Sequence, residues 1–162
     1  MSTRGNYEES KTVSPFETKW AWKGGAIAGF VATVAMGLAI SAVQLSTLRL
    51  AIAGLYGLEG SLVVGWIAHL AHGTLFGIIF AGLMADPGLF RVNDSIPKTI
   101  IAAVGYGLVL AIAGAGIVMP IWLGVIRFPT PPSIPNVTPP LLVWHAIYGV
   151  VLGSLFPFVD GL

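Results

Sequence analysis

Four long apolar runs, separated by short polar segments, dominate the chain. They cover residues 21–45, 62–84, 99–119 and 140–158, and each is close to the roughly 20 residues that an α-helix needs to cross a bilayer. Glycines interrupt every run, which transmembrane helices tolerate better than soluble ones. A four-stranded open sheet is excluded because lipid cannot satisfy its edges. The pattern predicts an all-α fold, a four-transmembrane-helix bundle.

The segments between the runs predict the rest of the organisation. Residues 1–18 are polar and predict a mobile tail, and residues 19–162 predict a single membrane domain. Residues 46–60 carry leucines with Arg49 and Glu59, which favours a short amphipathic helix in the interface. Residues 127–140 contain six prolines and predict a stiff, extended loop. Met119-Pro120 predicts the end of the third span or a kink in it.

Composition supports a membrane protein and excludes several functions. Charged residues make up only 9% of the chain, and the mean hydropathy is +0.87, whereas a soluble domain carries roughly 25% charged residues. The net charge of +1 gives nucleic acid no electrostatic basis for binding. Because the chain has no cysteine, disulfides, thiolate chemistry, iron–sulfur clusters and cysteine-based zinc sites are excluded.

The distribution of basic residues predicts the orientation. More basic residues lie on the side of the N-terminus than on the other side, and the positive-inside rule then places both termini in the cytoplasm of a multi-pass cell-membrane protein. The first side has Arg4, Lys11, Lys19, Lys23, Arg91 and Lys98, and the second has Arg49 and Arg127. Asn136-Val137-Thr138 is a glycosylation sequon on the predicted outer side, followed directly by Pro139.

One motif, H-x-x-[HY]-G-x-x-x-G-x-x-F, occurs twice, from His69 to Phe80 and from His145 to Phe156. The two copies are 76 residues apart (145 − 69), and at the same offset Gly29-Phe30 falls on Gly105-Tyr106. Each copy belongs to a unit of two spans, so both units enter the membrane from the same side. The sequence therefore predicts two parallel helical-hairpin repeats, 21–84 and 99–158, with His69 and His145 at matching depth.

Pairs of glycines four residues apart predict helix packing. Small residues let two helices approach closely, and this close packing drives helix association in lipid. We expect these glycines to form seams between spans two and four, or between protomers, and Gly25, Gly29 and Gly105 to act similarly. The pairs in spans two and four are Gly73 with Gly77 and Gly149 with Gly153.

The histidines are the candidate functional residues, because polar rings in a bilayer are costly and mark functional sites by default. Three interpretations stay open. Each imidazole of His69 and His145 hydrogen-bonds across the bundle, to the other histidine or to Tyr148. Alternatively, the pair supplies both axial ligands of a haem b, for which Arg49 and Arg127 are the outer candidates to hold the propionates. In the third, the histidines form a proton or ion path, with His72 and Tyr148 as a polar relay.

Enzymatic motifs are missing from the sequence. There is no Gly-rich phosphate loop, H-E-x-x-H, serine nucleophile elbow or pair of carboxylates. We therefore expect no catalytic residues, no metal site and no enzyme activity.

Three stretches of the chain carry a resemblance to known proteins: Gly65-Trp66-Ile67-Ala68-His69 through Gly77, Trp144-His145 through Phe156, and the opening Lys23-Gly24-Gly25-Ala26-Ile27-Ala28-Gly29. This pattern resembles a family of small four-helix membrane proteins of unknown function found in bacteria and archaea. The resemblance covers most of residues 22–158. It implies the four-helix fold and the importance of the histidines, and it implies no activity.

Together these observations predict a non-catalytic small integral membrane protein that is an accessory or structural subunit of a larger membrane complex, with electron-transfer complexes the expected host. No cofactor is required in this interpretation. The alternatives are a cytochrome-b-like haem protein with a bis-histidine site at His69 and His145, and an oligomeric channel or transporter. The expected partners are the lipid bilayer and other membrane subunits or further copies of this chain.

Overall fold

The computed structural model describes residues 21–86, 88–89 and 95–162. The described residues are helical without strands, and they contain four helices long and apolar enough to cross a membrane. The protein is thus a small, all-α, multi-pass integral membrane protein. The predicted tail (1–18) and the basic residues Arg4, Lys11, Lys19 and Arg91 lie outside the described residues, as do residues 87 and 90–94 between spans two and three.

The first two spans are joined by a short helix. Helix α1 covers Trp22–Gln44, the π-helical segment η1 covers Thr47–Ile52, and α2 covers Leu62–Met84. The predicted short helix in the first connection is therefore present, and η1 packs against the start of α2, where Gly65 leaves room for the Leu48 carbonyl. The turn back into α2 uses Gly57 and Gly60 at positive φ, 68° and 95°, which glycine adopts without steric cost.

The third span is longer than the sequence predicts. Helix α3 (Ile96–Val109), π-helical η3 (Leu110–Val118) and α4 (Met119–Val125) form one continuous helix of 30 residues. Pro120 does not end this helix. Its missing N–H would have served the Gly116 carbonyl in an α-helix, and that carbonyl instead accepts the N–H of Asn136 at 2.8 Å. The helix therefore does not end at Met119-Pro120, which was one of the two predicted outcomes, and the proline-rich loop supplies a donor to the freed carbonyl.

The fourth span, α5, covers Pro139–Val159. It begins after residues 127–138, which form neither helix nor strand, in agreement with the proline content. Thr138 caps the helix by accepting the Leu141 N–H at 3.4 Å, and Pro139 and Pro140 occupy the first turn, where a missing N–H leaves no intrahelical bond unmade.

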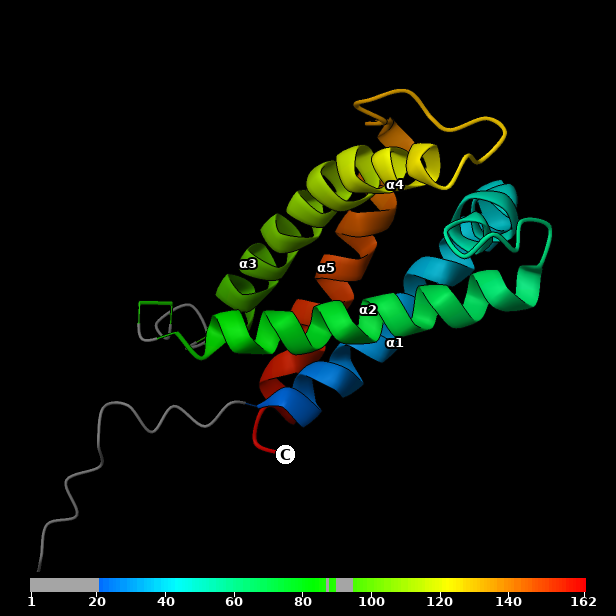
Figure 1. Cartoon of the computed structure of the whole chain (residues 1–162). Helices are drawn as coiled ribbons and strands as arrows, with labels where there is room; N and C mark the ends of the chain where they lie inside the picture. The colour runs from blue at the N-terminus through cyan, green and yellow to red at the C-terminus, as the bar shows by residue number, and fades with distance from the viewer. Residues whose placement is uncertain (1–20, 87, 90–94) are drawn as a thin grey trace, which may run out of the picture.

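Helices α1 and α5 form the centre of the bundle, with α2 packed on α1 and α3 packed on α5. Helix α2 and the α3–η3–α4 helix do not pack closely on each other: they approach near the connector between them and diverge toward the opposite end (Figure 1). The start of α1 and the end of α5 lie together, with Gly24 against the Val159 carbonyl. The described bundle thus begins and ends on one side.

The bundle has two halves of different character. We call the half that contains the start of α1 and the end of α5 the closed half. Its helices are in close contact at Gly25, Gly77 and Gly153, and Phe80 and Phe156 fill the space between them. We call the half toward η1 and α4 the cavity half, and it surrounds an internal space bordered by the three histidines.

Candidate functional site: an intramembrane cavity

A cavity of about 460 Å³ lies in the cavity half. Its lining is mostly apolar and comes from all four spans and η1, and both π-helical segments contribute, η1 through Thr47 and Ile52 and η3 through Leu110 and Gly114, among others. Long π-helical segments are rare, and π-bulges are frequent at functional sites. The chain therefore departs from regular α-helix where it borders this cavity.

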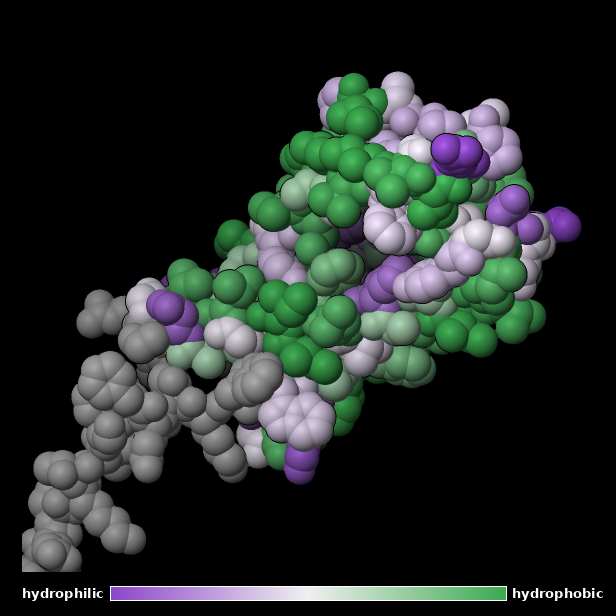
Figure 2. All heavy atoms as spheres, in the orientation of Figure 1, coloured by the Kyte–Doolittle hydropathy of each residue, from purple (hydrophilic) through white to green (hydrophobic). Residues whose placement is uncertain are grey.

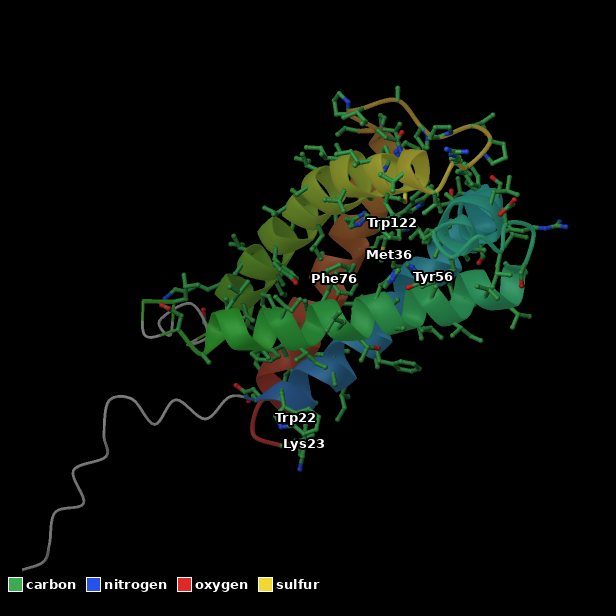
Figure 3. All side chains as sticks on the ribbon, in the orientation of Figure 1. Trp22, Lys23, Met36, Tyr56, Phe76 and Trp122 are labelled. Atoms are coloured by element: carbon green, nitrogen blue, oxygen red, sulfur yellow. The ribbon has the colours of Figure 1, made fainter. Side chains whose placement is uncertain are left out.

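The cavity opens between α2 and the η3–α4 part of the third span. Figure 2 shows a hollow there, in a largely hydrophobic face, with hydrophilic atoms beside it. In Figure 3, Met36 of α1, Tyr56, Phe76 of α2 and Trp122 of α4 lie around this space. Both flanking helices are long and apolar enough to cross a membrane, so the opening lies between two candidate spans.

All three histidines line this one cavity. His69 on α2 is 6% exposed, and its ring lies beside Gly37 of α1 and edge-on to Trp66, with ring centroids 6.1 Å apart. Its Nε2 is buried and has no hydrogen-bond partner among the described residues. A buried polar nitrogen of this kind is costly unless something satisfies it, so His69 is the strongest candidate for contact with a ligand.

His145 on α5 has a fixed tautomer. Its Nδ1 lies 2.9 Å from the Leu141 carbonyl oxygen, and because a carbonyl only accepts, Nδ1 carries the proton. In the neutral ring Nε2 is then an acceptor with a free lone pair. The backbone of its own helix thus orients this imidazole and defines which chemistry it offers to the cavity.

His72 and Tyr148 each have a partner of their own. The His72 Nε2 and the Tyr56 hydroxyl are 2.7 Å apart, and their rings stack with centroids at 5.9 Å. Tyr148, 2% exposed, donates its hydroxyl to the Gly73 carbonyl at 2.8 Å, which links α5 to α2. The relay predicted between His72 and Tyr148 is not formed by a direct contact, and neither His69 nor His145 bonds Tyr148 or the other histidine.

Trp122 closes one edge of the cavity. Its indole Nε1 donates to the Leu55 carbonyl at 2.9 Å, although the side chain is 50% exposed. Leu55 and Tyr56 are neighbours in the segment between η1 and α2. Through them this segment bonds to α4 at Trp122 and to α2 at His72. Trp144 is buried and also lines the cavity.

The glycine pairs pack within each hairpin instead of across the two hairpins. A side chain at Gly77 would meet the backbone of Gly25 and Gly29 on α1, and one at Gly73 would meet Thr33. A side chain at Gly149 or Gly153 would meet the backbone of α3, from residues 99–104. Of the two predicted locations, spans two and four do not form such a seam, because aromatic side chains lie between α2 and α5; seams between protomers stay a prediction.

The glycines of spans one and three differ from each other. Gly25 and Gly29 contact α2, as expected, whereas Gly105 is exposed and has open space around it. In α3 the close approach occurs at Gly107, which lies against the His145 carbonyl. The alignment of Gly29 with Gly105 therefore does not describe equivalent packing, and the duplication of a hairpin stays a prediction.

Sequence reasoning missed Tyr56 and Tyr106 as contributors. Tyr106 donates its hydroxyl to the Phe76 carbonyl at 2.9 Å, which joins α3 to α2 across the side where their backbones separate. Tyr56 is the only aromatic residue in the stretch 46–60, a signal that would have marked it. Its partner His72 lies 16 residues away, a pairing that no local pattern indicates.

Comparison of the chain with models of known families, with curated proteins and with solved structures finds no match. The resemblance to the four-helix family therefore stays a prediction, and the functional argument depends on the geometry of this chain.

Proposed function

We propose that this protein is a non-catalytic membrane protein that binds one small, largely apolar molecule taken from the bilayer. The observation that carries the proposal is the cavity of about 460 Å³, bordered by three histidines and open between α2 and η3–α4. Cavities of this size with apolar walls and a few placed polar groups are typical ligand sites.

The lateral opening supports a ligand that reaches the site through lipid. Hydrophobic side chains are exposed on both flanking helices, Leu75 and Ile79 on α2 and Val118 and Ile121 on the third span. A molecule that partitions into the bilayer reaches this opening without crossing the headgroup region again. A charged solute would first have to lose its hydration, which is costly in a low-dielectric medium.

Filling the cavity tests the proposal. A side chain at Gly114, which lines the cavity, meets no atom within 4 Å of its Cβ, and the same holds for Gly105, which lies outside the lining. We expect Gly114→Phe to fill the cavity and Gly105→Phe to leave it open. Native mass spectrometry of the full chain in nanodiscs with 4-hexylanisole should show a one-molecule adduct for the wild type and for Gly105→Phe, and at least fivefold less for Gly114→Phe. Equal occupancy of the two variants contradicts the proposal.

Haem b is the second candidate, favoured by the two imidazoles in one cavity and by the tautomer of His145. Metal-bound histidines commonly donate their other ring N–H to a backbone carbonyl, as His145 does to Leu141. It ranks second because neither Arg49 nor Arg127 lines the cavity, and the Arg49 Nε donates to the Gly60 carbonyl at 2.8 Å. A Soret band that disappears in His69→Ala would favour haem binding. A colourless preparation of the purified protein would rule haem out.

The role of accessory subunit is compatible with ligand binding and stays a prediction, as does that of an oligomeric channel or transporter. The abundance of helix-packing contacts supports the role of accessory subunit. The exposed apolar side chains offer surface to lipid and to other subunits alike. Co-purification of partner chains in stoichiometric amounts supports the subunit role. A homo-oligomer that gives flux in liposomes supports the channel.

A further inference from the structure

The polar atoms of the cavity differ in whether they are still available for a ligand. Two hydroxyl donors on the wall are engaged: Tyr148 donates to the Gly73 carbonyl at 2.8 Å and Thr33 to the Gly29 carbonyl at 2.6 Å. The His72 Nε2 is engaged with Tyr56 at 2.7 Å. Of the three imidazole Nε2 atoms on the lining, those of His69 and His145 therefore remain for a ligand.

These two imidazoles select the chemistry of the ligand. The His145 Nε2 is an acceptor, because Nδ1 carries the proton that the Leu141 carbonyl receives. The His69 Nε2 is buried without a partner among the described residues. A ketone, ether or ester has only acceptor oxygens and gives nothing to the His145 Nε2. A hydroxyl group donates to one nitrogen and can accept from another, so it suits either tautomer of His69.

We infer that the cavity binds an apolar molecule with a hydroxyl head, an alcohol or hydroquinone, whose O–H donates to the Nε2 of His145 or His69 while its apolar part lies against Phe76, Trp144 and η3. This inference rests on the proposed function and narrows it to one ligand class. Isoprenoid alcohols and quinols share this chemistry and both partition into bilayers.

A matched pair of probes tests the inference. 4-Hexylphenol has a donating hydroxyl, and 4-hexylanisole is its methyl ether without one. We measure the dissociation constant of each radiolabelled probe for the full chain in nanodiscs, with empty nanodiscs as the blank. A net hydrogen bond contributes on the order of 1 kcal/mol, so we expect the phenol to bind about five- to tenfold more tightly than the ether, and this preference to fall to about onefold in the double variant H69F/H145F.

His72→Phe is the matched control, because its Nε2 is already engaged by Tyr56; the preference for the phenol should survive there. Should the double variant fail to fold, ¹⁵N spectra of the wild type labelled at histidine replace it. The phenol, and not the ether, should shift the Nε2 resonance of His69 or His145.

The outcomes separate the inference from the proposed function. Binding of neither probe above the blank overturns both. Equal binding of the two probes leaves the apolar cavity as a site but overturns the hydroxyl inference, as does a preference that persists in H69F/H145F. Displacement of the phenol by decylhydroquinone or by farnesol supports the inference and assigns the source. Displacement by neither overturns it.

Discussion

The closed half and the cavity half of the same bundle are held together in different ways. In the closed half, backbones touch at glycines and the space between helices is filled by the rings of Phe80 and Phe156, 5.3 Å apart. In the cavity half, α2 and the third span diverge. Single hydrogen bonds join α3 to α2 through Tyr106, α5 to α2 through Tyr148, and α4 to Leu55 through Trp122. The two halves therefore differ in how closely their helices pack, and the proposed binding site lies in the half where they pack less closely.

The physical reason lies in what drives association in lipid. Apolar surface gains little from leaving lipid for protein, so helix contacts depend on close packing, with small contributions from interhelical hydrogen bonds. Glycines supply that packing in the closed half. The cavity half lacks this close packing between α2 and the third span and contains polar groups, and a binding site needs both open space and polar groups. Substitutions in the two halves should therefore have unequal effects.

The largest effect is expected for Gly77→Leu in the closed half. A Cβ at residue 77 would collide with the backbone of Gly25 and Gly29, and backbone cannot move aside as a flexible side chain does. Overpacking costs about 1–3 kcal/mol, and occasionally more, where neighbours can adjust, so we expect a loss at or above that range and no stable α1–α2 hairpin. Thermal melting in detergent measures it, with Gly105→Leu, in open space, as the control. Similar melting temperatures for the two variants would contradict the proposed difference.

The next effect is expected for Phe156→Ala. The ring is 2% exposed and contacts Phe80 edge-on. Phe→Ala costs about 3–5 kcal/mol in soluble cores through transfer and cavity terms, but the transfer term is small where the reference environment is lipid. We expect about 2 kcal/mol, measured by unfolding in mixed micelles with increasing SDS. Phe158→Ala, at a side chain that is 71% exposed, should change little; equal losses at both positions would show that the closed half is not tightly packed.

The sequence predicted three of the four spans closely, because the length of an apolar run is itself the signal. The predicted span 62–84 coincides with α2, and spans one and four differ from α1 and α5 by a residue at each end. The third was too short, because Pro120 indicates a helix end unless a distant donor compensates, and Asn136 is such a donor.

The candidate site was predictable only in part. Buried histidines in apolar runs indicated His69 and His145, and both line the cavity. The spacing of Gly73 and Gly77 gives the face of a helix that packs closely, but not the neighbour it packs against. The partners of His72 and Tyr148 are Tyr56 and Gly73, which lie 16 and 75 residues away in the chain, and contacts over such distances leave no local sequence signal.

The smallest effect is expected in the cavity half, for Tyr148→Phe. This change removes only the hydroxyl that donates to the Gly73 carbonyl at 2.8 Å and leaves the ring in place. Interhelical hydrogen bonds in membrane proteins average about 0.6 kcal/mol, so we expect a loss of that size in the SDS titration. The Gly73 carbonyl also keeps the option of a bond within its own helix, which limits the loss further. Because this hydroxyl already donates to the Gly73 carbonyl and not to a ligand, the dissociation constant of the phenol probe should change less than twofold. A loss of several kcal/mol would mean that the cavity half, too, depends on tight interhelical contacts for its stability, and the contrast between the two halves would fail.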